Sequence, residues 1–164
     1  MDDPWIGYLE AGAIDALVER ARQSPRGRLN LNLHPRLADP IQRLLNAGEP
    51  GSYVRPHRHR PAIWELVMAL RGHIDALVFD EEGRISRRVP LEAGGAGIIQ
   101  NTGGVWHSFV FVAPGSVAFE LKPGPYDAAA DKEFAPWSPR EDAPEATDFA
   151  RWMATAPVGA RWGI

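Results

Sequence analysis

Short apolar runs separated by polar and turn-forming residues occupy most of the chain. The segment Leu29–Leu33 has the sequence LNLNL, in which leucines alternate with Asn30 and Asn32. This two-residue period predicts a strand with one buried face. Further apolar runs predict strands at residues 41–45, 53–59, 64–70, 74–79, 85–91, 97–101, 108–112 and 117–122. Many short strands at near-regular spacing are typical of a β-sandwich or barrel.

Two helices are also predicted. Between Glu10 and Ser24, four apolar residues recur at helical spacing, and Pro25 with Gly27 ends the pattern. Near the other end of the chain, residues 146–153 place two aromatic residues and a methionine on one side of a short helix. The pattern as a whole therefore predicts an all-β protein with an N-terminal helix and a short terminal helix.

The length of the chain, 164 residues, suits a single domain with its own core. We divide it into an N-terminal helical segment (1–27), a barrel (28–126) and a C-terminal extension (127–164). The extension is irregular because proline and aspartate interrupt its apolar positions. We expect the helical segment and the extension to pack on the outside of the barrel.

Charge and cysteine content exclude several classes of function. The 21 acidic and 18 basic residues nearly balance, so no strong overall field indicates binding to nucleic acid or to a membrane surface. The absence of cysteine removes disulfides, thiolate catalysis and cysteine-ligated zinc. The first segment, MDDPWIGYLE, lacks the apolar core of a signal peptide, and no window approaches the length of a membrane span. We therefore expect a cytoplasmic protein.

Three histidines and one glutamate form the strongest chemical signal. His57 and His59 are two residues apart, so on a strand their rings project from the same face. Glu65 begins the next apolar run, and His107 follows a double-glycine turn at the start of a later strand. Three imidazoles and a carboxylate suit one divalent transition metal ion, Fe, Mn, Ni, Zn or Co, and offer no soft ligand to choose among them. The pattern therefore predicts a metal site formed by these four residues.

On a strand, side chains alternate between the two faces, and we expect the residues before His57 to continue this alternation. If the rings of His57 and His59 face the barrel interior, Tyr53 and Arg55 face it as well. An inward Arg55 would bind an anionic group of a substrate, whereas the alternative is an arginine at the barrel rim. Tyr53 and Glu120 are the candidates for a catalytic acid or base. Glu120 alternatively points to solvent or orients a metal-bound histidine.

Asn30 and Asn32 form the polar face of the first predicted strand. Such a face is ordinarily exposed to water in an antiparallel sheet. The alternative is that the strand crosses the mouth of the barrel, where the two amides would bind the hydroxyl groups of a sugar-like substrate. The sequence leaves both alternatives open.

The histidine motif resembles the cupin family. The second motif of the cupin family contains a proline, a glycine and a histidine. Gly104 and His107 match the glycine and the histidine, and Thr102 stands in place of the proline. This resemblance implies a cupin double-stranded β-helix, the jelly-roll barrel, with a metal ion held by the predicted ligands. The first cupin motif, a glycine, two histidines one residue apart, a glutamate and a closing glycine, is matched by Gly51, His57, His59, Glu65 and Gly72.

A second resemblance covers most of the chain. The segments NLNLHPRLADPIQRLLNA, PHRH, FELKPGPYD and DKEFAPW, in this order, are similar to the WbuC family of cupin-fold metalloproteins, which is found among bacterial polysaccharide and O-antigen gene clusters. The resemblance implies the fold and the metal ligands, but no reaction is established for that family. Small cupin barrels commonly cover their edge strands by dimerisation, so a homodimer is also implied.

The sequence supports three functions. The first, which we favour, is a metal-dependent enzyme, isomerase-like or epimerase-like, in which the metal is a Lewis acid for a small polar or anionic sugar-related substrate. The second is a non-catalytic module that uses the metal to bind or sense a sugar or nucleotide-sugar. The third is an iron-dependent dioxygenase. All three functions require a small-molecule ligand as the partner.

Overall fold

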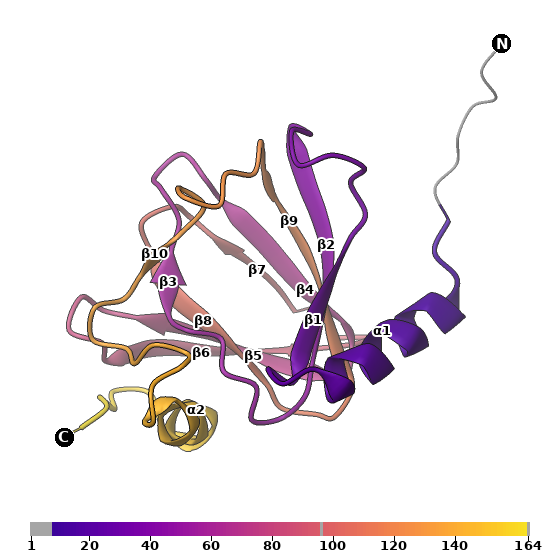
Figure 1. Cartoon of the computed structure of the whole chain (residues 1–164). Coiled ribbons are helices and arrows are strands. Elements are labelled where there is room, and N and C mark those ends of the chain that lie inside the picture. Colours follow the sequence, from indigo (N-terminus) through magenta and orange to yellow (C-terminus); the bar gives the residue numbers. More distant parts are fainter. Residues whose placement is uncertain (1–7, 96, 164) are drawn as a thin grey trace, which may run out of the picture.

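Two five-stranded antiparallel sheets face one another and form the body of the molecule (Figure 1). The computed structural model describes residues 8–95 and 97–163. Residues 1–7, part of the segment used above to argue against a signal peptide, lie outside this range. The elements in chain order are α1 (Ala11–Gln23), β1 (Arg28–Asn32), β2 (Ile41–Gly48), β3 (His57–Arg58), β4 (Glu65–Arg71), β5 (His73–Phe79), β6 (Ile85–Glu92), β7 (Ile98–Asn101), β8 (Trp106–Phe111), β9 (Ser116–Pro123), β10 (Glu133–Phe134) and α2 (Ala146–Thr155).

Strands that are distant in the sequence are neighbours in both sheets. The first sheet has the order β1-β2-β9-β4-β7, and the second has the order β10-β3-β8-β5-β6. Only the β1-β2 and β5-β6 pairs join consecutive strands, and the other pairs require the chain to cross between sheets. Two facing sheets connected in this way form a jelly-roll barrel. The fold predicted from the sequence, an all-β barrel with an N-terminal helix, is confirmed.

One helix covers the outer face of each sheet (Figure 1). Leu17 and Val18 of α1 are buried in a cluster with apolar residues of β2 and β9. Phe149 and Met153 of α2 are buried in a second cluster with residues of β5 and β8. A third cluster, which closes the barrel between the sheets, contains Val67, Ile74, Leu91 and Phe111. Within residues 8–95 and 97–163, no helix is long and apolar enough to cross a membrane.

The segment before His57 is irregular, which corrects one prediction. A strand was expected from Tyr53 onward, but β3 begins only at His57, because Pro56 lacks the N–H group that a strand ladder needs. The alternation of faces therefore does not extend back to Tyr53. Its ring packs edge-on against Phe149 with centroids 5.6 Å apart, and its hydroxyl donates to the carbonyl oxygen of Pro139 at 2.8 Å. Tyr53 thus belongs to the core beneath α2 and not to the barrel interior.

The C-terminal extension does more than pack on the outside of the barrel. Its later part, which contains α2, does lie outside the second sheet. However, β10 joins that sheet as an edge strand, with Phe134 paired to His57 and Glu133 to Arg58. The extension therefore completes the barrel at the point where the predicted metal ligands begin.

The turn that leads into β8 requires glycine at position 103. A Cβ atom on Gly103 would collide with the carbonyl oxygen of Arg60 and would lie 2.6 Å from backbone atoms of Pro61. We therefore expect Gly103→Ala to lower the free energy of unfolding by about 1–3 kcal/mol, the usual cost of overpacking. Urea denaturation followed by circular dichroism measures this change.

Gly12→Ala in α1 is the matched control, because a Cβ atom there meets nothing within 4 Å. Alanine is the better helix former, so this control should raise the free energy of unfolding by up to about 1 kcal/mol. Equal destabilisation by both substitutions would contradict the steric argument for Gly103.

Candidate metal centre and adjoining cavity

The four predicted metal ligands lie together inside the barrel. His57 begins β3, His107 lies opposite it on β8, and His59 follows β3 directly. Glu65 begins β4 and reaches the group from the other sheet. Each residue is between 1 and 4 % exposed, and their ligand atoms all lie within 4.8 Å of one another. The fold thus brings residues from three separate strands to one point.

Backbone carbonyl oxygens fix all three imidazole rings. A carbonyl oxygen can only accept a hydrogen bond, so an Nδ1 atom whose one contact is a carbonyl oxygen carries the hydrogen and donates it. In the neutral ring, the Nε2 atom is then left with a free lone pair. This is the usual support of a metal-binding histidine. The three Nδ1 contacts are His57 with Arg55 at 2.9 Å, His59 with Asp131 at 2.6 Å and His107 with Val105 at 2.9 Å.

Glu65 places its carboxylate among these Nε2 atoms. Its Oε1 atom lies 3.4 Å from Nε2 of His59, and its Oε2 atom lies 3.1 Å from Nε2 of His107. Nε2 of His107 is nevertheless buried without a hydrogen-bond partner among the described residues. A lone pair that faces a carboxylate in a protein interior is unfavourable unless a cation lies between them. The four residues therefore fit a metal ion, and their nitrogen and oxygen donors suit Fe, Mn, Ni, Zn or Co.

The surroundings of the centre set its protonation states. Burial, together with the positive charge of Lys132, holds the pKa of His57 well below its usual value. Burial alone would raise the pKa of Glu65, but the adjacent imidazoles of His107 and His59 outweigh it and hold that pKa well below its usual range. Burial lowers the pKa of His59, but the hydrogen bond with Glu65 outweighs this effect and raises it. A bound cation would replace that proton, because a metal ligand must be deprotonated.

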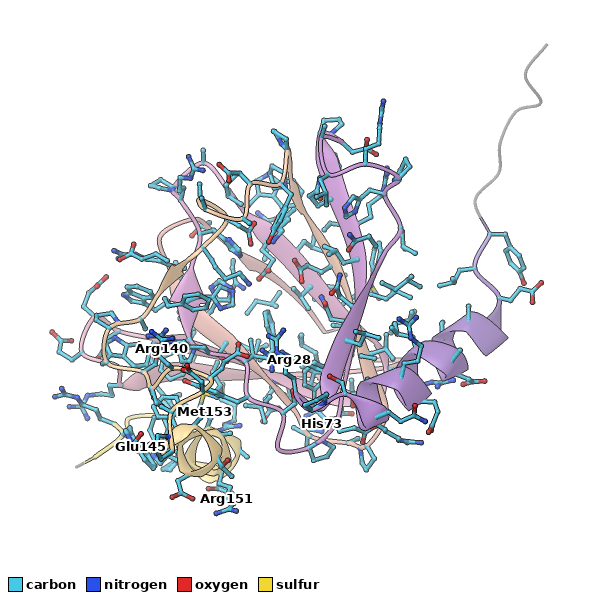
Figure 2. All side chains as sticks on the ribbon, viewed as in Figure 1. Arg28, His73, Arg140, Glu145, Arg151 and Met153 are labelled. Carbon is cyan, nitrogen blue, oxygen red and sulfur yellow. The ribbon has the colours of Figure 1, made fainter. Side chains whose placement is uncertain are left out.

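A cavity of about 500 Å³ adjoins the centre. His57 and Glu65 are part of its wall, so the centre is accessible from the cavity. The second sheet contributes an apolar wall formed by Phe109 and Phe111. Both lie on the same face of β8 as His107, because side chains alternate along a strand. Figure 2 shows Arg28 between the two sheets. The polar residues that the first sheet contributes include Arg28, Asn30, Asn32, Asn46, Glu120 and Lys122.

Four of the remaining predicted site residues line this cavity, namely Arg55, Glu120, Asn30 and Asn32, whereas Tyr53 does not. Asn30 and Asn32 lie on β1, and the side-chain amide of Asn30 donates to the side-chain oxygen of Asn32 at 2.8 Å. Both side chains are exposed, as expected of a face in contact with water, and both also line the cavity, as expected if the first strand lies at the mouth of the barrel. The inner face of the first sheet is therefore polar along the cavity.

Glu120 lies on the cavity wall, where its side chain is 13 % exposed. Asn46 donates to its Oε2 atom at 2.7 Å, and the ammonium group of Lys122 lies 3.7 Å from its Oε1 atom. Burial and the negative charge of Glu65 raise the pKa of Glu120 to about 7. Both the protonated and the ionised form are then populated near neutral pH, as proton transfer requires.

Two basic side chains of the cavity wall lack a close acidic partner. Arg55 donates to the hydroxyl oxygen of Ser138 at 3.1 Å and to backbone carbonyl oxygens, and forms no ion pair within the described part of the chain. The ammonium group of Lys132 lies 4.0 Å from Asp131. Lys122, by contrast, forms a close buried pair with Asp131 at 2.9 Å. The charge left on Arg55 and Lys132 favours an anionic ligand.

Sequence reasoning missed the part of the site that the C-terminal extension supplies. Asp131, Lys132 and Phe134 line the cavity, and the carbonyl oxygen of Asp131 orients His59. A two-residue strand is too short to show a period of two, so no alternation marked this segment.

Solved structures of low sequence identity share the fold. An uncharacterised conserved protein with a double-stranded β-helix domain from Klebsiella pneumoniae is 15% identical, with a TM-score of 0.55, over 82% of this chain and 98% of that one. The capsular polysaccharide assembling protein CapF from Staphylococcus aureus is 15% identical, with a TM-score of 0.57, over 68% of this chain and 30% of CapF. An oxalate oxidase in complex with glycolate is 15% identical, with a TM-score of 0.50, over 69% of this chain and 57% of that one.

These likenesses concern the fold. The chain spans less than two thirds of CapF and of the oxalate oxidase, so it corresponds to a part of each. What the three structures share with this chain is the cupin-type double-stranded β-helix that the sequence predicts.

A family comparison adds to the structural one. No curated protein matches the chain. Residues 9–91 match the family described as "Domain of unknown function (DUF6016)", and this region contains His57, His59 and Glu65. Because the match covers just over half of the 164 residues, the protein belongs to the DUF6016 family.

Proposed function

We propose that the protein is a metal-dependent enzyme that acts on a small anionic sugar-related molecule bound in the cavity. The observation that carries the proposal is the set of three imidazoles whose Nδ1 atoms are held by carbonyl oxygens while their Nε2 atoms converge on Glu65. Structural histidines rarely need three such matched orientations around one buried carboxylate. The centre also adjoins a cavity of a size that suits a small molecule.

The proposed metal ligands are His57, His59, Glu65 and His107. When bound, a divalent transition metal ion supplies Lewis-acid activation of a carbonyl or hydroxyl oxygen. His57 and Glu65 line the cavity, which gives a substrate oxygen a route to the centre. The carbonyl oxygen of Asp131 keeps His59 in the tautomer that the centre requires.

The cavity wall would bind and orient the substrate. The amides of Asn30 and Asn32 would bond to hydroxyl groups, as amides at sugar sites can both donate and accept. Arg55 and Lys132 would bind a carboxylate or phosphate group, because neither is closely paired with an acid. Phe109 would exclude water from the apolar side of the substrate.

Glu120 is the proposed acid or base. Glu120 lies on β9 and is paired with Val67 of β4, which is two residues along that strand from Glu65. From this position, Glu120 would hold a proton and exchange it with a substrate oxygen or carbon in the cavity. Tyr53 has no such role, since its hydroxyl is bonded to Pro139 outside the cavity.

The biological setting remains a prediction. The resemblance to the WbuC family supports a role in the metabolism of bacterial surface polysaccharides, and CapF, which shares the fold, is described as assembling capsular polysaccharide. The resemblance to small cupin barrels predicts a homodimer, and we expect a cytoplasmic location. Gel filtration with light scattering would measure the oligomeric state directly.

Protein purified without added metal is expected to contain about one equivalent of a transition metal by elemental analysis, because the four buried donors suit one ion. Metal removal with a chelator should lower the melting temperature, since a ligand that binds the folded state stabilises it. Restoring the metal should restore the melting temperature. A metal-free protein whose melting temperature does not respond to any of the five metals would contradict the proposal.

Turnover distinguishes an enzyme from the other two functions. The metal-loaded protein is incubated with D-glucuronate and D-galacturonate, and new sugar signals are sought by NMR. Metal-dependent conversion that is lost in Glu120→Gln would support the enzyme. Binding of a sugar acid without conversion would identify a binding module, and oxygen consumption that requires iron would identify a dioxygenase.

A further inference from the structure

His34 lines the same cavity but takes no part in the metal centre. It follows β1, lines the cavity and is 5 % exposed. Its Nδ1 atom lies 3.1 Å from the backbone nitrogen of Arg43 on β2 and 3.0 Å from the backbone oxygen of the same residue. Its Nε2 atom is buried without a hydrogen-bond partner among residues 8–95 and 97–163.

The contacts of Arg43 determine which nitrogen of His34 carries the hydrogen. The carbonyl oxygen of Arg43 already accepts the backbone N–H of Leu33 at 2.8 Å. The N–H of Arg43 has Nδ1 of His34 as its acceptor. A buried backbone N–H needs such an acceptor, so Nδ1 keeps its lone pair and the neutral ring carries its hydrogen on Nε2.

His34 therefore has the opposite tautomer to the three histidines of the metal centre. Those rings donate through Nδ1 and keep Nε2 lone pairs, which suit a cation. His34 accepts through Nδ1 and has an Nε2–H group, which suits an oxygen acceptor and repels a cation. A buried donor without an acceptor is unfavourable, so a bound ligand that supplies an oxygen would gain the full value of this hydrogen bond.

The position of His34 relates it to the substrate and not to the metal. His34 follows β1, whereas Glu65 begins β4. In the first sheet, β2 and β9 lie between these two strands, so β1 and β4 are three strand spacings apart, roughly 14 Å. Lys122 of β9, one of the two strands between them, also lines the cavity. Side chains that reach inward from both sides leave room for a molecule of about the size of one sugar acid.

We propose that His34 binds the substrate, with its Nε2–H group donating to a hydroxyl or carboxylate oxygen at the end remote from the metal centre. The ligand class is a monosaccharide acid, which carries oxygen acceptors at both ends. This inference rests on the proposed function, since it requires a small polar ligand in the cavity. His34 is thus a specificity-determining residue, because a buried donor rejects ligands that lack an acceptor at that end.

The substitution His34→Asn isolates the proposed contact. The side-chain oxygen of asparagine can take over from Nδ1 as the acceptor for the N–H of Arg43, but no atom reaches the position of Nε2. Metal content and melting temperature should therefore match the wild type. Binding of D-glucuronate to the metal-loaded protein, measured by calorimetry, should be roughly tenfold weaker, the value of about one net hydrogen bond.

The substitution His34→Gln provides the complementary control. Its longer side chain can return an amide N–H to the position of Nε2, so it should restore part of the affinity for D-glucuronate that His34→Asn loses. Equal affinity of the wild type and His34→Asn would overturn the proposal, because the Nε2–H group would then make no contact with the ligand. Failure of the fully metal-loaded wild type to bind D-glucuronate would overturn the ligand class.

A second measurement tests His34 without any ligand. Nitrogen-15 NMR of the imidazole rings distinguishes the two tautomers, and the wild-type spectrum is assigned by comparison with His34→Asn. An Nε2–H signal for His34 is expected, and an Nδ1–H signal would overturn the inference. Because this readout requires neither metal nor sugar, it separates a failure of the His34 assignment from a failure of the proposed function, which metal analysis reports.

Discussion

Protein that carries His57→Ala is expected to retain less than a tenth of the metal that the wild type binds. The substitution removes one of the three imidazoles that surround Glu65. Loss of a residue that merely supports a metal ligand weakens affinity by about 10–100-fold, so loss of a ligand itself should exceed about 100-fold. Elemental analysis after dialysis against metal-free buffer measures the retained metal, and circular dichroism shows that the variant is folded.

His73→Ala is the matched control for this experiment. His73 begins β5, outside the cluster, and its Nε2 atom lies 2.9 Å from Asp75. The control should keep the metal content of the wild type. Equal metal in His57→Ala and in the wild type would show that the ion is held elsewhere or not at all, and the proposed centre would be wrong.

Lys122→Met is expected to lower the free energy of unfolding by about 3–5 kcal/mol, because it leaves the Asp131 carboxylate buried without its partner. The side chains of Lys122 and Asp131 are 7 and 8 % exposed, and their charged atoms lie 2.9 Å apart. Burial lowers the pKa of Lys122, but the charges of Glu120 and Asp131 outweigh it and raise that pKa above its usual value. Urea denaturation measures the loss of stability.

The same substitution should weaken metal binding by about 10–100-fold, because the backbone of Asp131 orients His59. Lys132→Met is the control, since its side chain is 36 % exposed and lies 4.0 Å from the same carboxylate. A partly exposed pair at this distance contributes at most about 1 kcal/mol. Similar losses of stability in the two variants would contradict the assignment of Lys122 as the main partner of Asp131.

The parts of the fold that follow a regular period could be predicted from the sequence. Alternation in LNLNL located β1, and the helical spacing after Glu10 located α1 to within a residue at each end. The paired histidines, the glutamate at the start of the next apolar run and the later glycine-histidine turn identified all four members of the buried cluster, because each lies in or directly beside a strand. Local periodicity was sufficient there since the local and the global structure agree.

Prediction from the sequence failed where contacts between distant segments, and not a regular alternation of apolar and polar residues, determine the structure. Tyr53 lies only four residues before His57, but Pro56 interrupts the strand between them. The ring of Tyr53 therefore packs in the apolar core beneath α2. Lys132 and Phe134 reach the cavity because β10 pairs with β3, a contact between segments about 75 residues apart. His34 could be recognised as polar from the sequence, but its tautomer depends on the backbone of a neighbouring strand. No single-sequence pattern encodes such contacts.

The pairing of β10 with β3 also has a consequence for the order in which the protein is made. All four side chains of the candidate centre have been synthesised once His107 is added, but the carbonyl oxygen that orients His59 belongs to Asp131, and β10 ends at Phe134. A nascent chain that has only just passed β9 therefore carries the ligands without the support that aligns them. If the centre holds the proposed metal ion, its stable capture is expected late in biosynthesis, after the C-terminal extension has left the ribosome.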